Sequence, residues 1–232
     1  MSFSNLFYDG FNSQLIETAK YDGVLEIPRL QSQRRRIIPI RSIPFSKLHR
    51  FENPEKDMIV FYEHDTNFRK FISVPQRYEE KLAKVKIIST PDCSLYRDMP
   101  LWMQIANIGV SRSVGYHLQQ QGKYVIPNVR WGDERTYSSA GDEVPLAFMG
   151  IPKHNILSIG TYGCTKAKDD KYHLQAGLEN MLYYLKPTDV IVYGAYNNKI
   201  FRNYERLTNF RQIDDWTTYI HKQKEGGEHG YR

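Results

Sequence analysis

Short apolar runs recur along the chain and predict buried strands. Five are clear, at residues 58–62, 85–89, 124–129, 156–160 and 190–193, and residues 24–27 form a further candidate that Pro28 ends. The positions between these runs have a helical period. The clearest predicted helix covers 98–121, where Asp98 caps the start, Pro100 lies in the first turn and Gly122 follows the end. Further helices are expected at 13–20, 75–84 and 169–185.

Strands that alternate with helices predict βα units and a parallel sheet. The chain therefore belongs to the α/β class, with a mostly parallel sheet of about six strands. A complete eight-stranded barrel typically takes about 250 residues, and this chain has 232. We expect a partial or TIM-barrel-like sheet, and an open doubly wound sheet is the alternative.

The sequence divides into three parts. Residues 1–56 form an N-terminal segment with a basic, proline-containing arm, 57–221 form the α/β domain, and 222–232 form a polar, glycine-rich tail expected to be disordered. The prolines at 39 and 44 predict irregular structure in the arm. Its arginines are candidates for binding a nucleic-acid backbone, namely Arg34, Arg35, Arg36 and Arg41. A solvated connection is the alternative.

Composition narrows the class of partner and the cellular compartment. The formal net charge is +6, which favours anionic partners and nucleic acid first. The two cysteines, Cys93 and Cys164, form neither a disulfide framework nor a paired metal motif, which fits a reducing cytoplasm. No apolar run approaches the roughly 18 residues of a membrane span, and no signal peptide is expected.

Polar residues follow each predicted strand, and in a parallel sheet those positions share one edge. The most concentrated set ends the stretch YVIPNVRWGDE at 124–134. We take Asp92, Asp133, Glu134 and His64 as candidate catalytic residues, with His64 or Glu134 as a general base. Carboxylates on neighbouring loops favour Mg²⁺ or Mn²⁺, so the candidate metal ligands are Asp65, Asp92 and Asp133.

The same edge contains candidate ligand-binding residues. They are Asn128, Arg130, Trp131 and Thr161. Arg130 would hold a phosphate oxygen, and Trp131 would stack on a base or sugar. The structural alternative is that the aspartates cap helices and that Arg130 pairs with Asp92 or Asp133 to fix loops. A polar stripe of Gln104, Asn107 and Ser111 faces either this edge or, as we expect, solvent.

Several segments together resemble a known family. They are STPDCSLYRDMP, the helix with QIAN, VIPNVRWGDERTY, SIGTYGC and DVIVYG, of which RWGDER is the most specific. The combination, over roughly residues 57–197, resembles the phage and mobile-element family called domain of unknown function 4417. The matching motif positions here are Arg130, Trp131, Gly132, Asp133 and Arg135. The resemblance implies an origin in a phage, prophage or conjugative element of bacteria, and it implies no activity.

Three functions are compatible with these patterns. The first is an enzyme or binding protein for a phosphate-containing ligand, either a nucleotide or a nucleic acid. The second is a non-catalytic nucleic-acid-binding protein that uses the basic arm. The third is a host-interaction or counter-defence protein with a protein partner. No hydrolase, kinase, dinucleotide or zinc motif decides between catalysis and binding.

Overall fold

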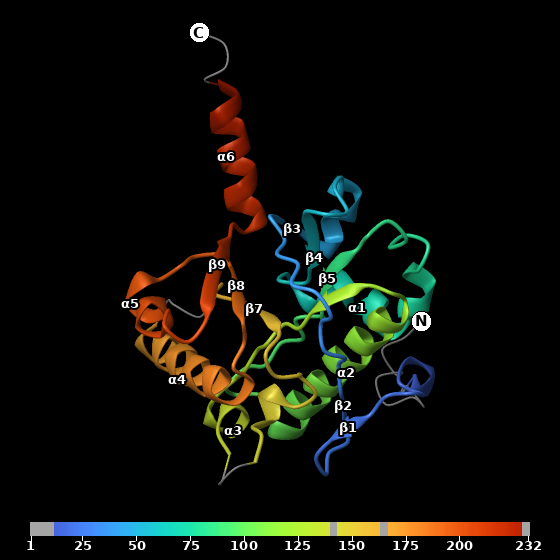
Figure 1. Ribbon diagram of the computed structural model, residues 1–232, viewed down its shortest axis with the longest axis vertical. Helices are drawn as coiled ribbons and strands as arrows, with labels where there is room; N and C mark the ends of the chain where they lie inside the picture. Colours follow the sequence, from blue (N-terminus) through green and yellow to red (C-terminus); the bar gives the residue numbers. More distant parts are fainter. Residues whose placement is uncertain (1–11, 140–142, 163–166, 229–232) are drawn as a thin grey trace.

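Two parallel sheets form the centre of the computed structural model, which describes residues 12–139, 143–162 and 167–228 (Figure 1). The larger sheet has the order β3 (Arg41–Pro44), β4 (Asp57–Val60), β5 (Ile87–Ser89) and β6 (Tyr124–Ile126). The smaller sheet has the order β7 (Ile156–Gly160), β8 (Asp189–Tyr193) and β9 (Asn209–Ile213). Neighbouring strands in space are also neighbours in sequence, so the α/β class and the parallel pairing are confirmed.

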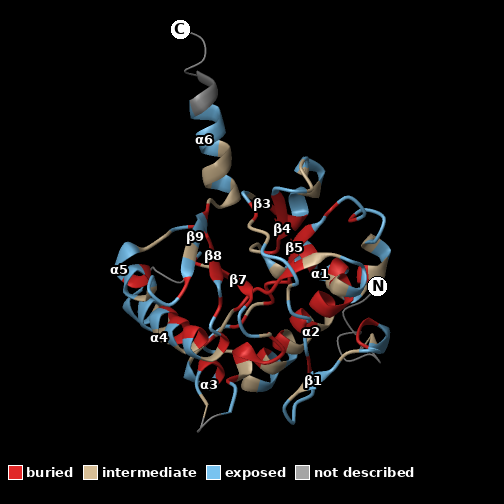
Figure 2. Ribbon diagram, viewed as in Figure 1, coloured by how far each residue is buried: buried red, intermediate tan, exposed pale blue. Residues whose placement is uncertain are grey.

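Helices cover the outer face of each sheet (Figure 2). Phe68 and Phe71 of α1 (Asp65–Ser73) and Val114 of α2 (Leu101–Gln120) pack in one cluster with outward residues of the larger sheet. The smaller sheet is covered by α3 (Glu134–Tyr137), α4 (Lys168–Leu185) and α5 (Asn198–Phe201). Five apolar residues of α4 recur at helical spacing and are buried against the sheet, namely Leu174, Leu178, Met181, Leu182 and Leu185.

The inner faces of the two sheets share a single apolar cluster. It takes residues from six of the seven strands, with Ile37 and Ile38 of the arm packed against it: Met58, Val60, Ile87, Ile126, Ile156, Ile191, Tyr193 and Ile213. In each strand these residues alternate with the outward ones, as the two-residue period of a strand requires. The cluster therefore joins the two sheets into one core.

Two local contacts join β6 to β7. Past the end of β6, Asn128 bridges Ser158 in parallel fashion, and the Val129 N–H donates to the Ser158 carbonyl at 2.8 Å. At the other end, the Gln33 side-chain amide donates to the carbonyls of Val125 and Ile156 at 3.1 and 3.0 Å. Its oxygen accepts from the Ile156 N–H at 2.8 Å. A single arm residue thus completes the hydrogen bonding between the sheets.

The remaining elements are short, except for the last helix. β1 (Tyr21–Asp22) and β2 (Ile27–Pro28) form an antiparallel pair. Short 3-10 segments lie at η2 (Ser13–Leu15), η3 (Phe45–Arg50), η4 (Pro75–Tyr78), η5 (Leu146–Phe148) and η6 (Arg202–Tyr204). α6 (Trp216–Glu228) projects from the body of the protein (Figure 1). None of the helices in the described ranges is long and apolar enough to cross a lipid bilayer.

Several expectations are corrected. The described strands form parallel sheets of four and three, so the expected single sheet of about six strands is not seen. The predicted strand at 24–27 is mostly a turn, and the predicted helices at 13–20 and 75–84 contain only 3-10 turns followed by bends. The arm contains β3, where Pro44 is tolerated because β3 is an edge strand. The chain is helical as far as Glu228, so the part of the predicted disordered tail that is described is ordered.

Candidate functional site

A buried carboxylate organises the polar residues at the carboxyl edge of the larger sheet. Asp92, which is 5% exposed, follows β5, and Asn128 and Arg130 follow β6. Arg130 donates to both Asp92 oxygens, from Nε at 2.6 Å and from Nη2 at 2.7 Å. The Asn128 Nδ2 donates to Asp92 Oδ1 at 2.7 Å. This bidentate pair fixes the direction of the guanidinium, whose side chain is 26% exposed.

Polar contacts from α2 hold the loop that contains Asp92. Ser111 Oγ donates to the Pro91 carbonyl at 2.8 Å, and Asn107 Nδ2 donates to the Ser94 carbonyl at 2.6 Å. Gln104 Nε2 donates to the Met99 carbonyl at 3.0 Å. The expectation that this polar stripe faces solvent is therefore wrong. Its side chains satisfy backbone groups of a loop that has no regular secondary structure of its own.

Three buried polar atoms at this edge have no hydrogen-bond partner in the described part of the chain. They are the Tyr62 hydroxyl, Ser89 Oγ and Asn128 Oδ1. Ser89 and Tyr62 continue the inner-face alternation of β5 and β4, and Asn128 bridges Ser158, which continues that of β7. The inward-facing side chains at the carboxyl ends of these strands are thus polar, whereas the inward-facing side chains earlier in the strands are apolar. A buried polar atom without a partner is rare in folded proteins.

Aromatic packing holds Tyr62 in this layer. Its ring stacks on Tyr193 with centroids 4.7 Å apart and lies against Gly160, where a Cβ would come within 2.7 Å of the ring. Burial first, and then the nearby Asp92 carboxylate, raise the pKa of the Tyr62 phenol, while Ser158 and Arg130 oppose them. Tyr62 therefore presents a protonated hydroxyl, which can donate a hydrogen bond.

A buried arginine supports the cluster from behind. Arg112 of α2 is 2% exposed, and its guanidinium donates to the carbonyls of Ala147 at 2.9 Å, Met149 at 3.1 Å and Asn128 at 3.3 Å. Burial lowers the pKa of Arg112 to about 10. Sequence reasoning missed Arg112, Tyr62 and Ser89, because an arginine in a helix and a tyrosine or serine at a strand end carry no motif.

The cysteines do not provide an activated thiolate in the described residues. Cys93, next to Asp92, is buried and reduced, and burial together with Asp65 and Asp92 raises the pKa of its thiol far above the ordinary value. The Cys93 thiol therefore stays protonated near neutral pH. Cys164 lies outside the described residues.

Several predicted site residues have structural partners instead. Asp133 caps α3 and binds the Arg135 guanidinium at 2.8 Å, and this hydrogen bond lowers the pKa of Asp133. Trp131 packs on Gly177 of α4 and donates to the His173 carbonyl at 2.8 Å, so its ring is a packing element in this structure. Thr161 donates to the Ala195 carbonyl at 2.9 Å.

The predicted metal trio is not brought together. Asp65 accepts from the Ser94 N–H and hydroxyl, whereas Asp92 holds Arg130 and Asp133 holds Arg135. No group of three His, Cys, Asp or Glu side chains in the described ranges is arranged to hold a metal ion. His64 and Glu134 are exposed, at the starts of α1 and α3.

A sequence model of the family described as Domain of unknown function (DUF4417) matches residues 19–213. The chain belongs to this family. The matched region includes the basic arm as well as both sheets. The resemblance recognised over 57–197 is confirmed, and its true extent is larger.

Two curated relatives of this DUF4417 protein come from phages. It is 28% identical over 164 residues to the Gene 1 protein of Mycobacterium phage D29. The aligned region covers 71% of this chain and 56% of that protein. It is 29% identical over 134 residues to the Gene 1 protein of Mycobacterium phage L5, and this aligned region covers 58% of this chain and 56% of that protein. The chain thus spans about half the length of these relatives and is phage-associated. No solved structure matches.

In this DUF4417 chain the four predicted nucleic-acid-binding arginines differ in their contacts. Arg36 binds both oxygens of Asp189, at 2.8 and 2.6 Å, and Arg41 binds both oxygens of Asp57 at the same two distances. Arg34 and Arg35 are exposed, and neither forms an ion pair within the described ranges. The first two therefore anchor the arm, and the other two remain at the surface.

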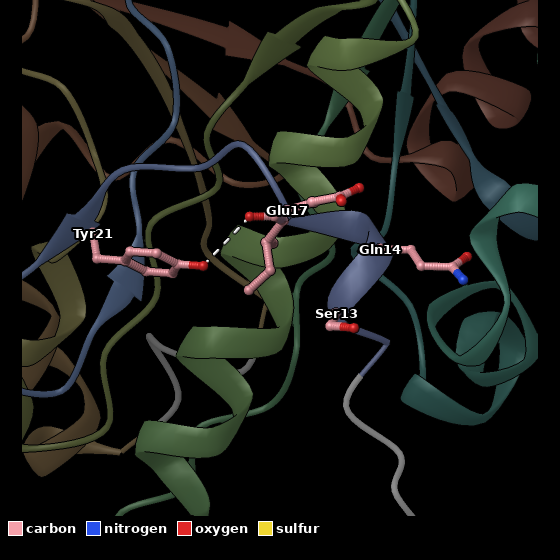
Figure 3. A pocket seen from close by; sticks show the side chains of 5 residues that line it. Ser13, Gln14, Glu17 and Tyr21 are labelled. Atoms are coloured by element: carbon pink, nitrogen blue, oxygen red, sulfur yellow. Dashed lines mark hydrogen bonds between the residues drawn. The ribbon is translucent and has the colours of Figure 1, made fainter.

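Two cavities in the described part of the chain lie away from the polar cluster. One of about 480 Å³ is lined by described residues between 13 and 21. Figure 3 shows the Tyr21 hydroxyl donating to a backbone carbonyl, that of Ile16, while the side chains of Gln14 and Glu17 extend away from this hydrogen bond. A second, of about 260 Å³, lies between η4 and the end of α2. It includes His117, whose pKa burial lowers, with Glu79 3.8 Å away. Neither cavity gathers polar groups from several strands.

Proposed function

We propose that this protein binds a phosphate-containing ligand, a nucleotide free or within a nucleic acid, at the polar cluster around Asp92 and Arg130. The observation that carries the proposal is the set of unpartnered atoms on Tyr62, Ser89 and Asn128 beside an oriented guanidinium. A ligand that supplied partners for these atoms would remove the cost of burying them.

The chemistry of the cluster suits such a ligand. The two hydroxyls can donate to phosphate or ribose oxygens, and Asn128 Oδ1 can accept from a base amino or sugar hydroxyl group. Arg130 supplies a cation that is already oriented, although Asp92 offsets its charge. We therefore expect selectivity from hydrogen bonding more than strong attraction to any anion.

We infer further that the two sheets act as one barrel-like frame for this site. The shared inner cluster and the two contacts between β6 and β7 support this view. In parallel α/β folds, ligands bind beyond the carboxyl ends of the strands. Tyr62, Ser89, Asn128 and Arg130 all lie at or beyond those ends.

Binding is better supported than catalysis. The Asp92 oxygens are engaged by Arg130 and Asn128, and the Cys93 thiol is protonated. His64 and Glu134 are exposed at the starts of α1 and α3, outside the set of buried, unpartnered atoms. We therefore assign Asp92 the role of positioning Arg130 and Asn128.

Calorimetric titration with nucleoside mono-, di- and triphosphates tests the proposal on wild type, Tyr62→Phe and Ser89→Ala. Each variant removes a hydroxyl that has no partner, so the ligand-free protein should keep its melting temperature. Nucleotide affinity should fall by about 2- to 10-fold for each lost hydrogen bond.

Ser42→Ala is the matched control. Ser42 Oγ is also buried without a partner, but it lies on β3, which contributes nothing to the cluster. Its removal should leave nucleotide affinity unchanged. If no nucleotide binds wild type, or if all three variants bind it equally well, the proposed site is wrong.

A further inference from the structure

The amino edge of the two sheets, opposite the polar cluster, carries exposed cations on almost every segment that enters a strand. Lys56 precedes β4, Lys84 precedes β5, Lys153 precedes β7 and Lys186 precedes β8. Arg34 and Arg35 of the arm are also exposed. We call these six residues the basic edge.

Hydrogen bonds to the backbone place these segments side by side. The Tyr124 hydroxyl at the start of β6 donates to the Arg35 carbonyl at 2.7 Å, and the neighbouring Gln33 N–H donates to Asn155 Oδ1 at 2.6 Å. The His154 N–H donates to the Leu185 carbonyl at 2.9 Å, which brings Lys153 next to Lys186. On the other side, the Tyr124 N–H donates to the Lys86 carbonyl at 2.7 Å, close to Lys84.

Four carboxylates of this edge are already paired. Asp57 and Glu52 bind Arg41, and Asp189 binds Arg36 and Arg211. Glu55 binds Lys86. By contrast, no member of the basic edge forms an ion pair with any residue in the described ranges. The positive potential of the six cations is therefore not cancelled locally.

We propose that the basic edge binds the phosphate backbone of a nucleic acid. Cations spread along one edge suit a linear array of phosphates, whereas a small anion would need them to converge on one point. Arg36 and Arg41 hold the arm in place through Asp189 and Asp57, so that Arg34 and Arg35 are presented at the surface. This site is separate from the nucleotide site proposed above.

An anionic membrane is a weaker match to this edge. Proteins that lie on membranes usually insert the apolar face of an amphipathic helix. The described segments that carry the basic edge are loops and turns that enter strands, and they contain no such helix. Nucleic acid needs only the cations.

The test compares two variants with equal loss of charge. In one, Lys84, Lys153 and Lys186 are changed to Gln, and in the control the exposed Lys168, Lys171 and Lys199 near the opposite edge are changed to Gln. Fluorescence anisotropy measures binding to short labelled DNA, as a duplex and as a single strand. If all six cations contact phosphates, wild-type affinity for the duplex should fall by about 10³-fold between about 50 and 200 mM salt.

The variant of the basic edge should lose affinity and have a salt slope shallower by about 0.9 for each cation removed. The control triple should bind as wild type does. The proposal is overturned if wild type binds neither form of DNA, or if both triples lose affinity equally. Stronger binding to phosphatidylserine vesicles than to DNA through the same three lysines would overturn it in favour of a membrane.

Discussion

At the scale of single residues, Arg112 is unusual because its buried guanidinium is bound by backbone carbonyls. A buried guanidinium usually pairs with a carboxylate, but Arg112 donates to Ser111 Oγ and the carbonyls of Asn128, Ala147 and Met149. Those carbonyls belong to two loops that have little regular structure. The single side chain of Arg112 therefore holds both the backbone beside Asp92 and the turn at η5.

We predict that Arg112→Met lowers the free energy of unfolding by about 3 kcal/mol, because the carbonyls lose charge-assisted hydrogen bonds and stay buried. Urea denaturation measures this change. Arg97→Met is the comparison: Arg97 pairs with Asp170 at the surface, with 42% of its side chain exposed, and should cost less than about 1 kcal/mol. Equal losses in the two variants would contradict the role given to Arg112.

The sequence revealed part of the candidate site for a physical reason. Asp92, Asn128 and Arg130 follow strands, and the rule that loops after parallel strands share an edge places them together. The same rule does not separate Asp133, which turns away to cap α3, because capping depends on the backbone of the next residues. Nor can it identify Tyr62 or Ser89, whose importance lies in partners they lack.

At the scale of elements, the Gln33 side chain makes the hydrogen bonds that strand pairing would otherwise make between β6 and β7. Its side-chain amide bonds the backbone of both β6 and β7, where the two strands have no ladder of their own. We predict that Gln33→Leu destabilises the fold by about 2 kcal/mol, since it leaves buried backbone groups unpaired. Hydrogen exchange at the Ile156 amide should become faster, because this amide loses its hydrogen bond to the Gln33 side chain. Gln31→Leu, at an exposed position of the arm, should leave that amide protected.

Short apolar runs predicted the buried strands, whereas the strands with polar or proline-containing sequences were not predicted. β4, β7 and β8 are fully or almost fully buried and were evident, whereas β9 is mostly exposed and reads as polar NFRQI. β3 was missed because Pro44 inside it and Pro39 just before it argue against a strand, although an edge strand tolerates a proline. The way the two sheets meet depends on tertiary contacts such as that of Gln33, which no local pattern encodes.

The last helix has two parts with different roles. The Trp216 side chain packs against the core, and the Trp216 backbone N–H donates to the Tyr193 hydroxyl at 3.1 Å. The side chains at 221–225 are exposed. We predict that ending the chain after His221 changes the free energy of unfolding by less than about 0.5 kcal/mol, since the one side-chain contact that the described residues lose is the surface ion pair of Lys222 with Asp214. Trp216→Ala should cost about 3 kcal/mol in the same chemical denaturation. A large loss on truncation would mean that the exposed turns carry packing.

At the scale of the whole molecule, the arm ties the two sheets together through charge. Arg41 binds Asp57 at the start of β4, and Arg36 binds Asp189 at the start of β8, so one segment holds a carboxylate of each sheet. Burial tends to raise the pKa of both carboxyls, but hydrogen bonds from Arg41 and two backbone amides for Asp57, and from Arg36 and Arg211 for Asp189, outweigh it and leave both pKa values lowered.

This arrangement predicts an acid-sensitive fold. Because the pKa of each carboxyl is lower in the folded protein than the ordinary 3.8, its stabilising contribution is complete above that ordinary value. The contribution is lost as the pH falls through the lower, folded-state pKa. The double variant Asp57→Asn, Asp189→Asn should be less stable at neutral pH by about 3 kcal/mol, with a flatter decline on acidification. Glu52→Gln, at a carboxylate that is 74% exposed, should keep the wild-type profile. Denaturation across the acid range measures all three, and parallel curves for the double variant and wild type would show that the arm does not hold the sheets together through these charges.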